Sequence, residues 1–267
     1  MNRLTGLQRI FDPLRYRSHR TIALIGVASG ALALAVGGGF TDAFWSGIAA
    51  GLGWAIAREL HPDSDMAGLA AGGIAGAFQA LVGGVALGVC YLLIVYLRII
   101  VRTTGKAPTT VDLVFNLVIV LFVADTLPGF LAALGVALAL FLSPILPMPS
   151  PSSHRMWAFA FAATALIGLV FGRAPEVPGP SGAMWLLFSV SMLAAVGLLS
   201  EARPRSVGDE DGEPLDGGRL RLGRIELIAL LVVVAISTLG SGIGPAAPAF
   251  AALLATGALR IRDLVSS

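Results

Sequence analysis

The polar residues of this chain are concentrated in a few short segments, and the densest is RELHPDSD at residues 58–65. Five of its eight side chains are ionisable: Arg58, Glu59, His61, Asp63 and Asp65. The pattern H-x-D-x-D within it places one imidazole and two carboxylates within reach of a single divalent ion. His61, Asp63 and Asp65 are therefore the candidate metal ligands.

The same segment also has a structural interpretation. Pro62 can end one helix, and Ser64 or a neighbouring aspartate can cap the next, where acidic groups favour the positive end of the helix dipole. Glu59 and His61 are not explained in this way, because a carboxylate at a helix C-terminus opposes the dipole and needs a partner. Contact with a substrate or a partner is the third interpretation.

A second polar segment, RIIVRTTGKAPTTVDLVFN, covers residues 98–116. Arg102 and Lys106 could bind an anion, although the TTGK stretch lacks the spacing of a phosphate-binding loop. The threonine pair before Asp112 is typical of a helix start. Asp112 and Asn116 lie one helical turn apart, so they could carry a polar strip into an apolar helix.

The third polar segment is PSPSSHR, which contains several serines and His154. No acid follows that could orient the imidazole, and no G-x-S-x-G motif surrounds the serines, so a turn with a capping serine is favoured over a nucleophile. Elsewhere, polar side chains within or at the ends of apolar segments are candidates for a solute or ion pathway. These are Gln79, Asp112, Asn116 and Asp125.

The composition of the chain is that of a membrane protein. Of its 267 residues, 56% are hydrophobic and 13% are charged, and the mean hydropathy is +0.86, whereas soluble domains carry about 25% charged residues. The 18 basic residues form no continuous face, so the lipid bilayer and not nucleic acid is the expected partner. A single cysteine excludes an internal disulfide and a cysteine-based metal motif, and no cofactor is implied.

Several apolar runs are too long for one membrane span. Residues 66–101 would form a helix of about 54 Å, whereas a bilayer core is about 30 Å thick. Such runs must fold back, and Gly- or Pro-rich stretches such as VGGV at 82–85 are the natural breaks. The sequence predicts ten transmembrane helices in five tight hairpins, at about 21–37, 42–59, 66–81, 85–102, 111–125, 128–143, 156–172, 182–200, 225–240 and 245–260.

The basic residues predict the orientation of these helices. With the N-terminus inside, all but Arg173 of the 18 Lys and Arg residues lie on the cytoplasmic side, as the positive-inside rule requires. The predicted fold is an all-α, polytopic integral membrane bundle in the plasma membrane with both termini in the cytoplasm. The third helix is short for a span, so a tilt or a re-entrant path is expected there.

The predicted organisation follows from these helices. The segments after the second and sixth helices both carry Pro, Ser, His and Met before a run of small residues, which suggests two four-helix repeats. The chain is divided into a basic amphipathic segment (1–20), an eight-helix bundle (21–200), a flexible cytoplasmic linker (201–224), a final hairpin (225–260) and a cytoplasmic tail (261–267).

Three functions are compatible with these features. A small-solute or ion permease agrees best with Gly-rich helices, short loops and Gly/Pro interruptions. An interfacial enzyme acting on a lipid or isoprenoid headgroup would use Glu59, His61 and the two aspartates as ligands or acid–base groups, and phosphate would be bound by Arg58, Arg102 and Lys106. A scaffold would bind other proteins through its loops, and any of the three is compatible with a homo-oligomer.

The orientation can be tested by labelling single cysteines in a Cys90→Ser background. We expect a cysteine at Gly83 to react with a membrane-impermeant maleimide from outside intact cells, because it lies in a predicted external turn. A cysteine at Lys106 should react only after the membrane is permeabilised. External labelling at Lys106 would overturn the ten-helix count.

Overall fold

The computed structural model describes residues 16–172, 179–199, 204–208 and 212–266, so most of the predicted basic N-terminal segment and Arg173 lie outside the described residues. Within these ranges the chain is all-α, and the prediction of ten helices is confirmed. The helices are α1 (Arg17–Ala35), α2 (Phe40–Leu60), α3 (Asp65–Leu81), α4 (Leu87–Val101), α5 (Thr110–Val123), α6 (Leu127–Leu142), α7 (His154–Phe171), α8 (Gly182–Leu198), α9 (Gly217–Ser237) and α10 (Ala247–Ser266), with a short 3₁₀ turn η1 (Ser241–Ile243).

Several helices begin where the sequence offers side-chain caps. Ser64 accepts a hydrogen bond from the backbone N–H of Ala67 at the start of α3. Thr109 and Asp112 form a reciprocal capping box on α5, and Ser181 caps α8. Each cap satisfies a backbone donor that the first helical turn leaves without a partner.

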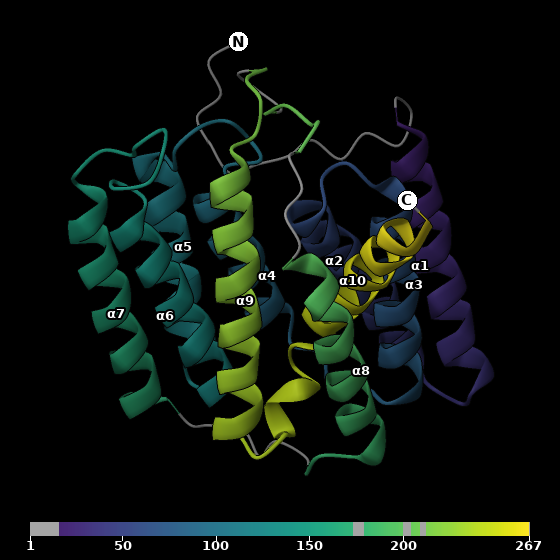
Figure 1. Cartoon of the computed structure of the whole chain (residues 1–267). Helices are drawn as coiled ribbons and strands as arrows, with labels where there is room; N and C mark the ends of the chain where they lie inside the picture. Colours follow the sequence, from purple (N-terminus) through teal and green to yellow (C-terminus); the bar gives the residue numbers. More distant parts are fainter. Residues whose placement is uncertain (1–15, 173–178, 200–203, 209–211, 267) are drawn as a thin grey trace.

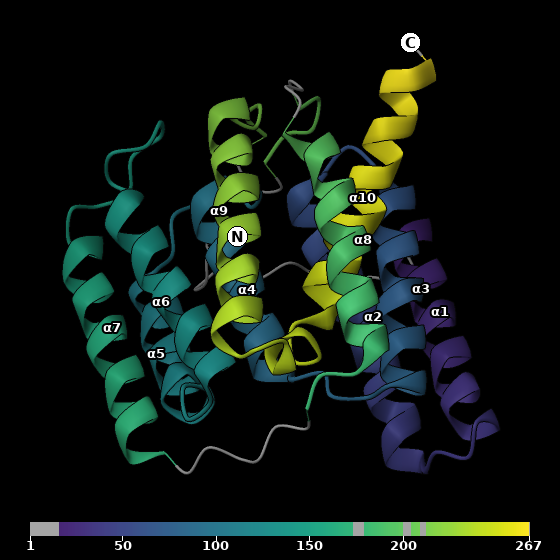
Figure 2. The same cartoon turned by 60° about the horizontal axis from the view of Figure 1, so that its bottom comes forward.

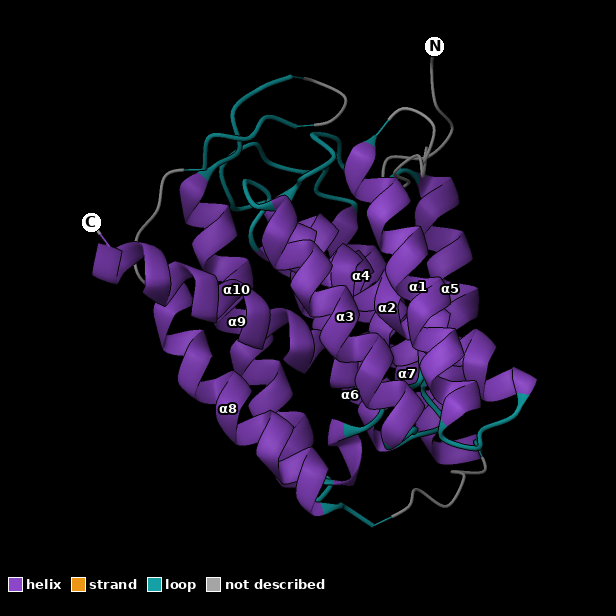
Figure 3. Ribbon diagram, turned by 90° about the vertical axis from the view of Figure 1, so that its right-hand side faces the viewer, coloured by secondary structure: helices purple, strands orange, loops and turns teal. Residues whose placement is uncertain are grey.

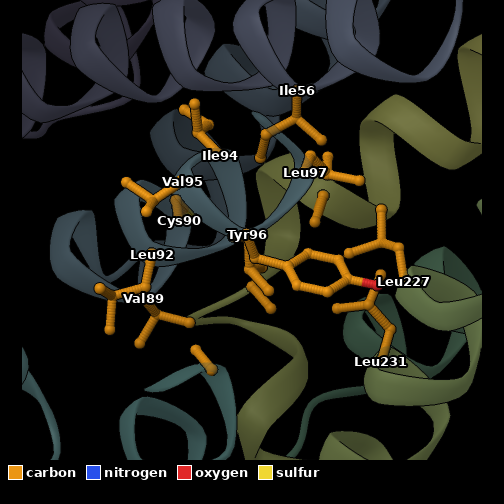
Figure 4. Close-up of a cluster of buried hydrophobic side chains, with 14 of the residues drawn as sticks. Ile56, Val89, Cys90, Leu92, Ile94, Val95, Tyr96, Leu97, Leu227 and Leu231 are labelled. Carbon is orange, nitrogen blue, oxygen red and sulfur yellow. The ribbon is translucent and has the colours of Figure 1, made fainter. Parts of the chain in front are cut away.

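Successive helices run in opposite directions and form two groups around a central pair (Figures 1 and 2). On one side lie α5, α6 and α7, and on the other lie α1, α2, α3, α8 and α10, with α4 and α9 between them. Helix α4 is the buried centre of the bundle, because nearly all of its side chains from Val89 to Val101 are inaccessible. Figure 4 shows these side chains packed against Ile56 of α2 and against Leu227 and Leu231 of α9.

Small residues fill the contacts of α3, and many large apolar residues lie on the outside of the bundle. The buried face of α3 consists entirely of alanine and glycine, and a Cβ added at Gly53 of α2 would lie 2.8 Å from the carbonyl oxygen of Ala71. In contrast, the most exposed side chains include Phe40, Phe122 and Phe171, which are 84%, 74% and 81% accessible. By length and apolarity, α1 and α7 could each cross a membrane, whereas α4, α5, α6 and α8 are apolar but shorter.

The connection between α9 and α10 differs from the exposed external turn that the sequence predicts. Gly242, Ile243 and the whole first half of α10 are buried. The carbonyl oxygen of Pro245 accepts hydrogen bonds from the backbone N–H of Ala86, at 3.2 Å, and from the thiol of Cys90, at 3.3 Å. Helix α10 therefore begins inside the bundle, and it crosses the other helices obliquely (Figure 3).

The start of α9 also differs from the prediction. The helix begins at Gly217, capped by the Asp216 side chain, so residues 217–224 are helical and do not belong to a flexible linker. Among the described residues before it, Val207 and Pro214 form an isolated antiparallel bridge. The Gly/charge-rich composition of this stretch concealed a helical stripe of buried residues, Leu220, Gly223 and Leu227, that continues into the apolar part of α9.

Two glycine substitutions test the close packing. A Cβ at Gly257 of α10 would lie 2.1 Å from the carbonyl oxygen of Ala194 in α8, so Gly257→Ala must separate the two helices, at a cost of about 1–3 kcal/mol in the free energy of unfolding. At Gly51 of α2 a Cβ would meet nothing within 4 Å, so Gly51→Ala should stabilise the helix by about 1 kcal/mol. Thermal unfolding in detergent would measure both, and equal effects would contradict the packing.

Candidate functional site

The polar segments meet at one end of the bundle, which we call the basic end, where the α2–α3, α4–α5 and α6–α7 connections surround the start of α9 (Figure 1). Its centre is Glu59, whose side chain is fully buried. One carboxylate oxygen accepts a hydrogen bond from Nε of Arg98 at 2.9 Å, and the other accepts one from the hydroxyl of Thr103. The residue that the sequence leaves unexplained thus joins the end of α2 to the end of α4.

The structure does not assemble the H-x-D-x-D pattern into a metal site. Asp65 forms an ion pair with Arg58 at 2.5 Å. Asp63 accepts hydrogen bonds from the backbone N–H groups of Arg205 and Ser206, at 3.0 and 2.7 Å, and from the Ser206 hydroxyl. In the part of the chain that the structure describes, no three His, Cys, Asp or Glu side chains are placed to hold a metal ion.

The charge states of this loop follow from its contacts. Burial lowers the pKa of His61, and the nearby Arg224 guanidinium lowers it further, against an opposing effect of Asp63. Partial burial alone would raise the pKa of Asp63, but the hydrogen bonds from Ser206 and Arg205 outweigh it and lower this pKa. At neutral pH the loop therefore holds an uncharged imidazole beside a carboxylate. The Nδ1 atom of His61 is buried with no hydrogen-bond partner in the described structure.

Two residues of α9 that the sequence analysis did not single out organise the basic end. Arg219, only 1% exposed, donates to the carbonyl oxygens of Ile99 (2.9 Å), Ile100 (2.6 Å) and Pro147 (2.6 Å). Its guanidinium thus satisfies carbonyl groups at the end of α4, where no further helical turn supplies donors.

The second residue is Arg224, which is also buried. It donates to the carbonyl oxygen of Leu60 at 2.9 Å and to that of Leu198 at 3.3 Å, so it caps the ends of α2 and α8. The signal available in the sequence was the spacing, because both arginines fall on the same helical stripe as Leu220, Leu227 and the rest of the buried face of α9.

His154 and Arg102 hold the loops on the other side of α4. Arg102 adopts a left-handed backbone conformation (φ 58°) and donates to the Ser150 hydroxyl at 3.0 Å. The His154 ring lies 3.4 Å from the hydroxyl of Ser143 and contacts the backbone of the α4–α5 loop at Pro108. The α4–α5 loop therefore lies between the segments containing Glu59 and His154, and its Lys106 side chain is exposed.

The four pathway candidates lie in different places. Gln79 accepts a hydrogen bond from the backbone N–H of Val85 at 2.9 Å, so it shapes the α3–α4 connection. Asp112 belongs to the capping box at the start of α5, and Asp125 is partly buried in the α5–α6 connection.

Asn116 differs from the other three because it lies in the middle of a helix. It is the seventh of the 14 residues of α5 (116 − 110 + 1 = 7), and it is 2% exposed. Its amide nitrogen donates to the carbonyl oxygen of Asp112 at 2.7 Å, and its side chain interacts with the Tyr91 hydroxyl of α4. Its oxygen Oδ1 is buried without a hydrogen-bond partner in the described structure.

Glu226 of α9 lies further along its helix than the predicted final hairpin (225–260) would place it. With a helix start at residue 225, Glu226 would lie at the water boundary. Because α9 begins at Gly217, Glu226 is the tenth of 21 residues (226 − 217 + 1 = 10), and it accepts a hydrogen bond from the Tyr96 hydroxyl at 2.9 Å.

No family model, no curated protein and no solved structure matches this chain. The function is therefore argued from the residues themselves. The carboxylates of the basic end are occupied by hydrogen bonds and ion pairs between helices, which is typical of a structural junction. In the middle of their helices, Asn116 has a buried oxygen without a hydrogen-bond partner in the described structure, and Glu226 accepts a hydrogen bond from Tyr96 of α4.

A pair of arginine substitutions on α9 tests the role of the basic end. Arg219→Ala would remove the donors to three carbonyl groups, so we expect the free energy of unfolding to fall by roughly 2–4 kcal/mol. Arg221→Ala, two residues away on the exposed face, should change it by less than about 0.5 kcal/mol. Thermal unfolding of the purified proteins would compare the two, and a tolerated Arg219→Ala would show that these contacts do not stabilise the bundle.

Proposed function

We propose that this chain is a multi-pass membrane protein, with its ten helices crossing the plasma membrane and its basic end in the cytoplasm. The distribution of side chains supports this proposal. Large phenylalanine, leucine and valine side chains cover the outside of α1, α5, α7 and α8, whereas alanine, glycine and serine fill most of the contacts among α1, α2 and α3. An exterior of large apolar side chains is favourable in lipid, where small residues between helices let them approach closely.

The surface between α1 and α2 agrees with lipid contact. It contains an apolar groove of about 670 Å³ lined by residues of both helices, including Gly26, Gly47 and Phe44. Of its lining side chains only Trp54 carries a polar atom, so the groove has no groups for acid–base or nucleophilic chemistry. In a bilayer this groove would be filled by acyl chains.

Within the membrane we propose the function of a small-solute permease. The observation that carries it is the buried connection between α9 and α10, which meets the α3–α4 connection through the hydrogen bond from Ala86 to Pro245. Irregular backbone at membrane depth is tolerated only inside protein or beside a cavity, and transporters build their sites from such interrupted helices. The enzyme alternative gains no comparable support, because Glu59, Asp63 and Asp65 are each engaged in contacts between segments.

Asn116 is the residue that we assign to the solute pathway. It lies halfway along α5 beside the central helix, and its buried Oδ1 has an unused capacity to accept a hydrogen bond. A buried acceptor of this kind costs free energy unless a ligand or water completes it. A neutral amide with a free acceptor favours a polar solute that carries an N–H or O–H donor.

The test is Asn116→Leu in proteoliposomes supplied with a panel of labelled amino acids, sugars and polyols. For any solute that the wild-type protein transports, we expect Asn116→Leu to reduce flux to the level of empty liposomes while thermal unfolding stays close to wild type. The matched control is Val118→Leu, which changes an exposed side chain of the same helix. Chelation of divalent ions should have little effect. Wild-type flux in a folded Asn116→Leu protein would contradict the proposed pathway.

A further inference from the structure

Glu226 is a partly buried carboxyl group near the middle of α9, and it is bonded to the central helix α4. Arg219, on the same helix, binds the carbonyl oxygens of Ile99 and Ile100 and so marks the level at which α4 ends. Glu226 lies seven residues beyond Arg219, which is about 10 Å further along the helix axis. An ionisable side chain at such depth in a membrane bundle is costly and is a functional site by default.

Tyr96 of α4 is the hydrogen-bond partner of Glu226. Its side chain is 1% exposed, and its hydroxyl donates to Oε2 of Glu226 at 2.9 Å. Figure 4 shows the Tyr96 ring extending toward α9, with its oxygen beside Leu227. The ring is also close to α6, because a Cβ at Gly135 would lie 3.7 Å from it. The carboxyl is thus held by one neutral donor among apolar side chains.

Among the residues that the structure describes, no cation forms an ion pair with Glu226. Helix α9 packs against α2, α4, α6, α8 and η1, and the last three carry no ionisable side chain. On α4 the nearest cation in sequence, Arg98, is bound to Glu59. On α2, Arg58 is paired with Asp65, and Asp42 lies in the first turn at the opposite end.

The arginines of α9 itself are also accounted for. Arg219 and Arg224 donate to the carbonyl groups at the basic end, and Arg221 is exposed. A desolvated carboxylate with no counter-ion is strongly penalised, whereas its protonated form is not. Burial and the missing counter-ion therefore favour the form that has taken up a proton.

We propose that Glu226 is the proton-binding site of the permease and that solute movement is coupled to protons. The step is the reversible reaction of the Glu226 carboxylate with one proton to give the carboxylic acid, in which a single O–H bond forms or breaks. The proton comes from water on one side of the membrane and returns to water on the other. This inference rests on the proposed function, whose coupling ion it names.

The pair also provides a link to conformation. A charged acceptor makes a stronger hydrogen bond with the Tyr96 hydroxyl than a neutral acid does, so protonation weakens the contact between α4 and α9. The far end of α9 continues into the buried connection to α10, which is bonded to the start of α4 at Ala86 and Cys90. Protonation of Glu226 thus weakens the contact between α4 and α9. The connections that follow α9 and precede α4 meet at the opposite end of the bundle, so this end is coupled to the protonation state.

The binding site can be tested without a known solute. Infrared difference spectra of the full-length protein in nanodiscs, recorded between about pH 5 and 9, report the carbonyl band of any protonated carboxyl group. Ordinary surface carboxyl groups are ionised in this pH range, because their pKa is about 4. We expect a titrating band in the wild type, its loss in Glu226→Gln and a shifted band in Tyr96→Phe. Glu213→Gln, which removes an exposed carboxyl, is the matched control and should leave the band unchanged.

Coupling is tested by flux with an imposed pH gradient. For a solute from the panel that moves, we expect the gradient to drive accumulation in the wild type and not in Glu226→Gln. A spectrum without a titrating band would overturn the proton site but leave the permease standing. A band at Glu226 together with gradient-independent flux would overturn the coupling. If no solute moves, the proposed function fails, and the spectrum still decides whether Glu226 binds a proton.

Discussion

Helices α2, α4 and α8 end in carbonyl groups that no further turn can satisfy, and α9 supplies donors for all three. Arg219 and Arg224 place their guanidinium groups among these carbonyls, where a lysine would present one point charge instead of a planar set of donors. Because backbone groups buried without partners are costly, the ends of these helices depend on α9 being docked. The Glu59–Arg98 pair adds a second junction at the same level.

The rest of the architecture follows from the size of the residues between helices. Where α2 and α3 meet, glycine and alanine let the backbones approach, and at the crossing of α8 and α10 the Gly257 position has no room for a methyl group. Contacts of this kind depend on close van der Waals packing, to which each atom pair contributes little and the whole interface contributes much. Two polar groups lie near the middle of helices: Asn116, whose Oδ1 is buried without a partner in the described structure, and the partly buried Glu226, which is bonded to Tyr96.

Much of the helix pattern could be predicted from the sequence, because apolar length, Gly/Pro breaks and capping residues such as Ser64 and Thr109 are local signals. The start of α9 could not be placed by the same reasoning, since arginine was interpreted as a solvated residue, whereas Arg219 and Arg224 are buried by binding carbonyls distant in sequence. The α9–α10 connection has the composition of an exposed turn, and only tertiary packing buries it. The depth of Glu226 follows from that misplaced helix start. Membrane orientation and the solute pathway stay predictions.

The position of α10 has a consequence for the order of folding. It packs against α2 and α3, which lie roughly 200 residues earlier in the chain, so these contacts carry a large loop-closure entropy cost before they form. Until α10 docks, the faces of α2 and α3 that it covers have no protein partner. The packing of these two early helices is therefore complete only once the last helix, α10, has docked.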